Sequence, residues 1–266
     1  DYNPYIKLPI VYGKLFYDQS VNWKFYTEPE ENLHGKKMYW PRGKVLGGSS
    51  SINAMVFARG SRNDFDEWGT YASGWSWEDI EPFFRKMETW KGKSDQSRGQ
   101  SGPIRVTDVS SQAHPLTNCY LEATEQIGIS KNPDYNTGNI EGSFVYQTNT
   151  HKGLRSSAAN AYLSPIKKQK NLVVITRALV KKILFEGARA VGVEYSHKGS
   201  PKVAHATKEI IISAGALGSP QLLQISGIGP AEKLKDLNIK VLSDLPDVGQ
   251  HLKDHIGLDY TLLTNQ

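Results

Sequence analysis

The residues best suited to chemistry in this sequence lie in one glycine- and serine-rich stretch, PRGKVLGGSSSINAMVFARGSRNDFDEW, which runs from Pro41 to Trp68. Its adjacent glycines, Gly47 and Gly48, allow positive φ and a close approach of the backbone to a ligand. The serines that follow add three hydroxyl donors, and successive backbone N–H groups in such a loop can converge on an anion. The stretch is typical of a loop that binds a phosphate or a dinucleotide, and a flexible serine loop is the alternative.

Neighbouring residues favour the anion-binding interpretation. Arg42 and Lys44 add positive charge, and a helix that starts at Ser49–Ser51 would add its N-terminal dipole. Apolar residues follow between positions 52 and 58, which indicates that the loop is anchored to a buried core. The chain contains neither the GxGxxG fingerprint of dinucleotide-binding domains nor the P-loop sequence GxxxxGKS/T. These residues alone therefore do not identify the ligand.

A second glycine-rich stretch, SAGALGSPQLLQISGIGP (213–230), predicts a turn between a strand and a helix. The preceding ATKEIIIS is expected to form a buried strand, with Ser219 as the helix N-cap and Pro220 at the first helical position. Gly227 and Gly229 fit the C-terminal end of that helix. Such a helix start can face a cofactor, and a packed strand–helix corner fits the spacing equally well.

The remaining candidates for catalysis or metal binding carry no motif. His251 and His255 stand four residues apart in HLKDH, which lacks the glutamate of the HExxH zinc helix and a third ligand cluster. No GxSxG sequence occurs, so a hydrolase has no support. The single cysteine, Cys119, excludes an internal disulfide, and we expect it to be a packed small residue on a helix. The sequence predicts no metal site and names no catalytic residue.

The composition is that of a globular protein. The chain has 266 residues, of which 38% are hydrophobic and 22% charged, which excludes a disordered or fibrous protein. Its net charge of +5 is scattered along the sequence, so we expect no nucleic-acid partner. No apolar run reaches the ~18–20 residues of a membrane span, so no transmembrane segment is expected. Mitochondrial and secreted locations both stay open.

The elements that must position these stretches fall into two groups. Residues 1–40 are aromatic-rich and irregular, as in a segment that lies over another surface. Helices and loops predominate between 75 and 160, and strands and strand–helix pairs follow. Helices are expected at 77–90, 115–129, 156–165 and 231–239, and a β-meander at 172–176, 179–185 and 190–196. This order indicates an α+β insertion in a nucleotide-binding α/β domain.

Local signals mark the boundaries of two of these helices. Ser76 is a good N-cap for the helix at 77–90, and Asp79 stands at the capping-box position. Pro82 fits poorly inside a helix, so we expect a kink or a new start there. Pro165 is expected to end the helix at 156–165.

Both glycine-rich stretches resemble sequence signatures of one enzyme family. PRGKVLGGSSSINAMVFARGSRNDFDEW resembles the first signature of the glucose–methanol–choline (GMC) oxidoreductases, and SAGALGSPQLLQISGIGP is similar to their second. Further stretches match in order, so the resemblance covers nearly the whole chain: YTEPE, GWSWEDIEPFFRKME, GLRSSAANAYLSP, NLVVITRALVKKILFEGARAVGVEY and LPDVGQHLKDH. Within the family, the choline and alcohol dehydrogenase branch is the most similar.

The resemblance implies a fold, a cofactor and a reaction. GMC oxidoreductases use FAD to accept a hydride from an alcohol carbon at flavin N5. The fold implied is α/β plus α+β: a glutathione-reductase-type FAD-binding domain (1–73 and 156–252) interleaved with a sheet-and-helix substrate domain (74–155 and 253–266), both incomplete. By the same resemblance, the residues that contact FAD are Val45, Gly48, Ser49, Asn53, Ala54, Met55, Val56, Val180, Ala214 and Gly215.

Three departures from the family pattern bear on this interpretation. The GxGxxG fingerprint would precede Asp1, and the family's active-site histidine and its partner would lie beyond Gln266. The chain is therefore expected to be an internal fragment without a catalytic base. Some members attach FAD through a histidine in the first signature, and this chain has Ile52 there, which argues for non-covalent FAD.

Two functions follow as competing hypotheses. The first is the central part of an FAD-dependent choline or alcohol dehydrogenase that acts on a small-molecule alcohol, with the alcohol and the electron acceptor open. The second is a non-catalytic, GMC-derived secreted or matrix protein kept for binding. The absence of the fingerprint and the catalytic histidine favours the second if 266 residues is the length of the mature protein. An end within the strand-like GLDYTLL favours the first, because an unpaired strand edge would be exposed.

Overall fold

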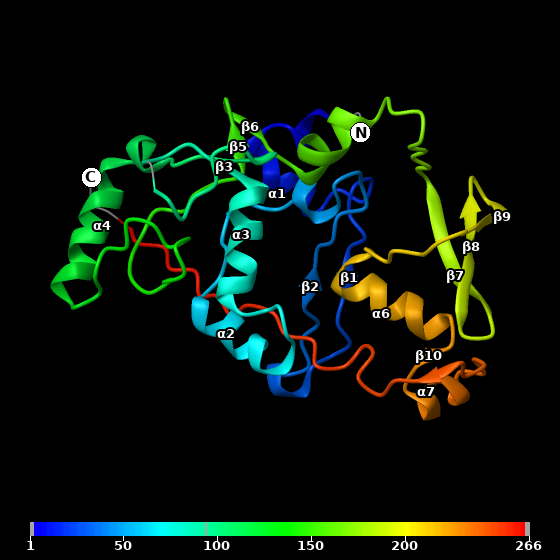
Figure 1. The fold of residues 1–266 in the computed structure, drawn as a ribbon. Coiled ribbons are helices and arrows are strands. Elements are labelled where there is room, and N and C mark those ends of the chain that lie inside the picture. Colours follow the sequence, from blue (N-terminus) through cyan, green and yellow to red (C-terminus); the bar gives the residue numbers. More distant parts are fainter. Residues whose placement is uncertain (1–2, 94, 264–266) are drawn as a thin grey trace. The chain divides into compact units, whose positions relative to one another are not determined.

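The computed structural model describes residues 3–93 and 95–263. The chain divides into two compact units, Asp1–Leu172 and Val173–Gln266, and we describe each by itself (Figure 1). The outermost residues of the predicted domains, 1–2 and 264–266, lie outside the described residues, as does residue 94. No helix in the described part of the chain has the length and apolar character needed to cross a membrane.

The first unit is built from short helices, single helical turns and two- or three-residue strand pairs. Its α-helices are α1 (Tyr12–Leu15), α2 (Arg62–Tyr71), α3 (Trp77–Met87), α4 (Pro115–Gln126) and α5 (Ser164–Ile166). Its 3-10 turns are η1 (Pro4–Ile6), η2 (Pro9–Val11), η3 (Glu31–Leu33), η4 (Gly48–Ser51) and η5 (Ser110–Gln112), and η6 (Ala159–Leu163) is a π-helical turn. Its strands pair as antiparallel β1 (Phe25–Tyr26) with β2 (Tyr39–Trp40), parallel β3 (Glu88–Trp90) with β4 (Ile104–Val106), and antiparallel β5 (Thr150–His151) with β6 (Leu154–Arg155).

Helix α3 begins where the sequence predicts. The Ser76 hydroxyl accepts from the Asp79 N–H, and the Asp79 carboxylate accepts from the Ser76 N–H, which completes the capping box. The expectation of a new start at Pro82 is wrong, because the proline lies inside one helix. Trp90 is not helical: it is buried in β3, where it pairs with Val106.

Two other expectations for this unit are corrected. Cys119 is exposed on α4 and is not a packed core residue, because its position faces away from the residues that α4 contributes to the interior. The helix expected at 156–165 is the turn η6 followed directly by α5, and Pro165 lies within α5 and does not end it.

Two buried clusters form the core of the first unit. Ile6, Leu15, Val21 and Ile52 pack together. The irregular N-terminal segment therefore covers part of the glycine-rich segment 43–56, which we call the glycine loop. The second cluster joins Phe57 to β3 and β4 through Trp90, Ile104 and Val106. Both clusters include residues of the stretch 41–68, so this stretch is anchored at Ile52 and again at Phe57.

A buried ion-pair network lies beside the second cluster. Glu88 is fully buried, and its carboxylate accepts from the Arg59 Nη2 at 2.6 Å and from the Arg98 Nε at 2.8 Å. Arg98 also donates to Asp134 at 2.7 Å. Burial lowers the pKa of Arg59; at Arg98 the effect of burial is outweighed by the bonds to Glu88 and Asp134, and the pKa is raised. The network holds Arg59, which lies downstream of the glycine-rich residues and of the turn at 53–56.

The second unit contains an antiparallel three-stranded sheet and two helices (Figure 1). The sheet order is β7 (Ala178–Glu186), β8 (Arg189–His197) and β9 (Ser200–His205). Helix α6 (Gly215–Ile225) lies against β7, and the Ser226 Oγ after it accepts from the Ile183 N–H at 2.9 Å. Parallel β10 (Ile228–Gly229) and β11 (Ser243–Asp244) flank α7 (Ala231–Asp236).

The meander expected here is confirmed in its two longer strands and wrong in the third. Residues 172–176 form no strand, and the third strand is β9, which the sequence analysis missed. The buried strand expected over 206–213 is an irregular segment in which Ile211 is 79% exposed. Neither run belongs to a sheet of the described residues. The Ala206 N–H donates to the Val191 carbonyl of β8 at 2.8 Å, but a strand needs a hydrogen-bonding neighbour along its length.

Further boundaries in this unit differ from expectation. Helix α6 starts at Gly215, with Ala214 as N-cap, and not at Pro220. Ser219 lies inside the helix, and its Oγ accepts from the Ala214 N–H at 3.1 Å, so the residue still satisfies a group at the helix start. The strand-like residues 257–263 form no strand in the described part of the chain.

Candidate functional site

The glycine loop is shaped by three glycines with different roles. A Cβ on Gly43 would lie 2.2 Å from the carbonyl carbon of Gly48, so the backbone of the loop closes on itself here. Gly47 has a φ of +88°, and a Cβ there would lie 2.5 Å from the Ser51 Oγ. Gly48 has a φ of +54°, and apart from Gly48 itself and its two chain neighbours no described residue lies within 4 Å of where its Cβ would be. One face of the loop is therefore open at Gly48.

The three serines after Gly48 differ in what their hydroxyls can still bind. The Ser50 Oγ donates to the Gly47 carbonyl at 2.6 Å, and the Ser51 Oγ donates to the Leu46 carbonyl at 2.8 Å. The Ser49 Oγ accepts from the Gly43 N–H at 3.1 Å, and the residue is exposed. The expectation of three hydroxyl donors is thus wrong: two hydroxyls stabilise the loop, and the hydrogen of Ser49 is left for a ligand.

The expected helix at Ser49–Ser51 is the single turn η4. A macrodipole requires several aligned peptide units, so a turn of four residues contributes no helix dipole of note. Anion binding by this loop therefore depends on its individual N–H and O–H groups. Val45 is half-buried against the first core cluster and accepts the Gly48 N–H at 2.8 Å, which ties the loop to the core.

The segment Asn53–Val56 has an unusual backbone. Met55 is 4% exposed and has a φ of +62°, a conformation that costs a residue with a Cβ about 1 kcal/mol or more. Its N–H donates to the Asn53 Oδ1 at 3.1 Å, and its carbonyl accepts from the Asn149 N–H at 2.7 Å. The Ala54 N–H donates to no described residue. The surroundings thus hold a strained turn that leaves one backbone donor available.

A residue that the sequence analysis did not single out connects these parts. Arg155, at the end of β6, is 3% exposed, and its Nη1 donates to the carbonyl oxygens of Ser50 and Asn53 at 3.2 and 2.8 Å. The Nη2 of this guanidinium is buried without a hydrogen-bond partner. The stretch GLRSSAANAYLSP matches the family, but the sequence alone gives no signal that its arginine is buried beneath the loop.

The three predicted site residues of the second unit lie at the sheet edge and at a helix start. Val180 is in β7, opposite Tyr195, with 37% of its surface exposed. Ala214 is the N-cap of α6, and Gly215 is its first residue, with a φ of +83°. Within their own unit, Val180 and Ala214 are accessible, and Gly215 lies at a turn that requires glycine.

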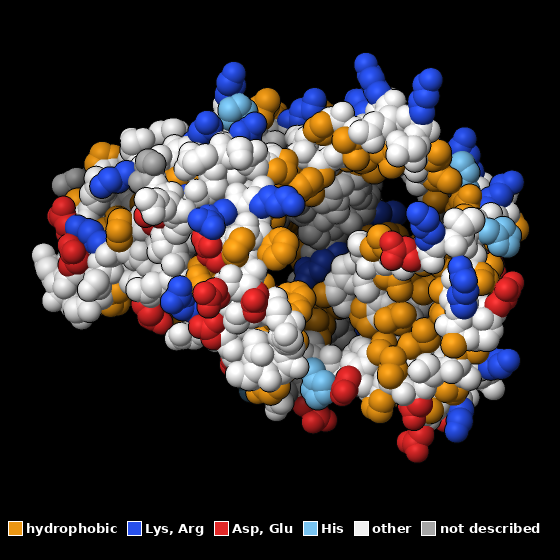
Figure 2. Space-filling view, viewed as in Figure 1, with side chains coloured by type: hydrophobic (Ala, Val, Ile, Leu, Met, Phe, Trp, Pro, Cys, Tyr) orange, Lys and Arg blue, Asp and Glu red, His pale blue; other side chains and the backbone are white. Residues whose placement is uncertain are grey.

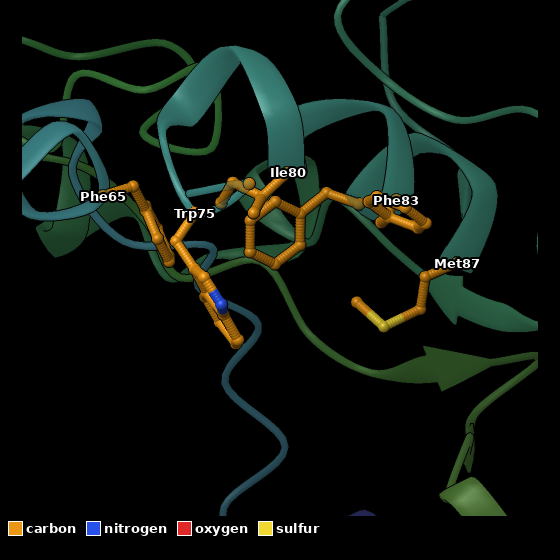
Figure 3. Close-up of a pocket in the computed structure, with 7 residues that line it drawn as sticks. Phe65, Trp75, Ile80, Phe83 and Met87 are labelled. Atoms are coloured by element: carbon orange, nitrogen blue, oxygen red, sulfur yellow. The ribbon is translucent and has the colours of Figure 1, made fainter. Parts of the chain in front are cut away.

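An apolar groove in the first unit contains none of the predicted site residues. It has a volume of about 440 Å³ and lies between α2 and α3 (Figure 3). No charged residue lines it, so it offers no group for acid–base chemistry. Its lining residues are Phe65, Gly74, Trp75, Ile80, Phe83, Phe84 and Met87.

In the part of the chain that the structure describes, charged side chains do not gather into a second candidate site. Figure 2 shows lysine and arginine side chains dispersed over the visible face, with acidic side chains between them. Among the described residues, no group of histidine, cysteine or carboxylate side chains could hold a metal ion. His251 lies in a segment without regular structure and pairs with Asp247 at 3.4 Å.

Comparison with known proteins identifies the family. A sequence model described as GMC oxidoreductase matches residues 20–257. The chain belongs to the GMC oxidoreductase family. It is 44% identical over 254 residues to human mitochondrial choline dehydrogenase, a match that covers 95% of this chain and 43% of that protein. The GMC resemblance inferred from the two signatures is confirmed.

Solved structures agree with this assignment. Pyridoxine 4-oxidase from Mesorbium loti matches with a TM-score of 0.88 and 30% identity, over 93% of this chain and 49% of that one. An FAD-dependent oxidoreductase from Chaetomium thermophilum matches with a TM-score of 0.85 and 32% identity, over 92% and 45%. The chain thus spans less than half the length of the relatives it matches, and it shares the mixed helix-and-sheet FAD-binding fold of the family.

The residues present fit the FAD that this family implies. FAD is flat and carries a negatively charged pyrophosphate, so it needs small side chains, backbone donors and positive charge. The loop offers the open face at Gly48, the free hydroxyl hydrogen of Ser49 and the Ala54 N–H. The unpartnered Arg155 Nη2 adds a buried positive charge close to the loop.

Proposed function

We propose that the whole protein, meaning the natural polypeptide that contains this sequence, is an FAD-dependent oxidoreductase that oxidises a small alcohol, of the choline dehydrogenase type. The observation that carries the proposal is the glycine loop, whose strained and internally bonded backbone leaves an open face with selected donors. The high identity to a choline dehydrogenase makes choline the first alcohol to test. Bound FAD would supply the hydride acceptor for the alcohol carbon.

The residues proposed to hold FAD keep their positions from the sequence analysis. Gly48 and Ser49, with Val45, approach the flavin and pyrophosphate. The absent Cβ of Gly48 leaves room for the cofactor beside the backbone, and the free hydroxyl hydrogen of Ser49 can donate to it. The turn at Asn53 to Val56 lies along the isoalloxazine ring, and its Ala54 N–H is the available backbone donor. Val180 contacts the adenine, and Ala214 and Gly215 lie near the ADP part.

The finer fold proposal is a glutathione-reductase-type FAD-binding domain, 1–73 and 156–252, interleaved with a substrate domain, 74–155 and 253–266. Its support is the sequence resemblance, which covers both signatures. Non-covalent attachment of FAD is proposed from Ile52. This side chain is 1% exposed in the first core cluster and has no heteroatom that could bond to a flavin.

The test is the spectrum of the purified whole protein. We expect the protein to show the visible absorption bands of an oxidised flavin. After acid precipitation the pellet should be colourless, because the cofactor is not covalently bound. Colour that stays with the precipitate would contradict non-covalent attachment.

Anaerobic addition of choline or of simple primary alcohols should bleach the bands, because the alcohol reduces the flavin. A colourless protein that cannot be loaded with FAD would instead support the non-catalytic binding protein.

A further inference from the structure

Arg155 lies where three separate segments of the first unit meet. Its Nε donates to the Ile6 carbonyl at 2.8 Å, and its backbone N–H donates to the Lys7 carbonyl at 3.0 Å. Its Nη1 has acceptors at the Ser50 carbonyl, 3.2 Å away, and at both the carbonyl and the Oδ1 of Asn53, each 2.8 Å away. One side chain thus joins the N-terminal segment, the glycine loop and β6.

The contacts of Arg155 fall on the parts of the loop that determine its shape. Ser50 belongs to η4, the turn whose glycine and serine bonds leave the open face. The Asn53 Oδ1 also accepts the N–H of Met55, the residue held at positive φ. The guanidinium therefore orients the Asn53 side chain, and Asn53 in turn holds the strained turn.

The charge of Arg155 is compensated by carbonyl and amide oxygens only. No carboxylate among the described residues pairs with it, in contrast to Arg59 and Arg98, which share Glu88. Burial lowers the pKa of Arg155 to about 10, so the group remains a cation at neutral pH. A buried cation without a counter-ion is costly, and a negatively charged ligand bound nearby would offset part of that cost.

We infer that Arg155 is the positioning residue of the FAD-binding loop, and that its buried charge favours negative charge on the bound cofactor. This inference rests on the proposed function. The Arg155 guanidinium fixes Ser50 and Asn53 from beneath the loop, and its Nη2 is a buried donor without a hydrogen-bond partner in the described part of the chain. Positioning and charge are separable, because lysine keeps the charge but carries its donors on one nitrogen, which cannot replace both the Nε bond to Ile6 and the Nη1 bonds to Ser50 and Asn53.

The experiment compares Arg155→Met and Arg155→Lys in the whole protein with the unchanged protein. Three quantities are measured: the dissociation constant of FAD from the reconstituted apoprotein, the midpoint potential of the bound flavin, and the free energy of unfolding. Arg155→Met should weaken FAD binding by about tenfold or more and lower the midpoint potential. Arg155→Lys should weaken binding as well but keep the potential close to that of the unchanged protein.

The matched control is Arg98→Lys. Arg98 is also buried, at 2% exposure, and also makes several hydrogen bonds, but its partners are Glu88, Asp134 and Gln147 and not the loop. This variant should lose stability and keep the FAD dissociation constant and the potential. A merely structural role for Arg155 would make its variants behave like the control.

The outcomes separate this inference from the proposed function. If the unchanged whole protein binds no FAD, the proposed function fails and the inference fails with it. If the unchanged protein binds FAD and the Arg155 variants bind it equally well, only the inference is overturned. If Arg155→Met does not fold, Arg155→Lys decides: unchanged FAD affinity overturns the inference, and weaker binding at a retained potential supports it.

Discussion

At the scale of single residues, Glu88 is the carboxylate that joins the two arginines of the buried ion-pair network. Its carboxylate is fully buried and accepts from Arg59, Arg98 and the Gly99 N–H. Glu88→Gln keeps the shape but removes the charge and turns an amide N–H₂ toward two guanidinium groups. We expect a loss of about 3–5 kcal/mol in the free energy of unfolding, measured by urea denaturation.

The control for Glu88→Gln is the same substitution at an exposed ion pair. Glu125 pairs with Lys131 at 2.8 Å, and both side chains are more than 40% exposed. Glu125→Gln should change the free energy of unfolding by at most about 1 kcal/mol, because water screens such pairs. Equal effects of the two substitutions would show that the buried network does not stabilise the unit.

The residue scale also separates what sequence can predict from what it cannot. The open position at Gly48 followed from glycine's freedom at positive φ. Which of the three serine hydroxyls remains available did not follow, because the partners of Ser50 and Ser51 are carbonyl groups of the folded loop. The role of Arg155 was missed for the same reason: its acceptors lie about a hundred positions away in the chain.

At the scale of elements, α3 shows that a helix start is specified locally. The Ser76 hydroxyl and the Asp79 carboxylate satisfy N–H groups that would otherwise lack partners. Ser76→Ala should therefore lower the free energy of unfolding by about 1 kcal/mol, and Ser76→Asn, which keeps an acceptor, should lower it by much less. Chemical denaturation of both variants checks this, and a loss of equal size in both would contradict the capping role.

Elements that depend on distant partners were predicted less well. β7 and β8 were found because they are consecutive and pair across a short turn. The apolar runs at 172–176 and 206–213 have the composition of strands but belong to no sheet of the described residues. Composition indicates that a segment can be a strand, and only the remainder of a sheet makes it one.

At the scale of the whole molecule, the second unit exposes an unusual amount of apolar surface. Helix α6 is rich in leucine and isoleucine, yet none of its residues is buried. Beyond α7, Ile256 is 97% exposed, Leu258 76% and Leu263 93%. Apolar side chains left unburied in this way normally lie against other protein. The relatives, of which this chain spans less than half, have further polypeptide that can provide such a surface.

This exposure predicts how the 266-residue chain behaves when it is expressed by itself. We expect it to bind a hydrophobic fluorescent dye, to associate with itself at rising concentration, and to bind FAD much more weakly than the whole protein, because its apolar segments lack partners. Ile256→Lys combined with Leu258→Lys should reduce the association, since charge on an unpaired segment opposes pairing. Sedimentation and dye titration measure both effects. A monomeric 266-residue chain that binds one FAD per molecule would show instead that these residues form a complete flavin site.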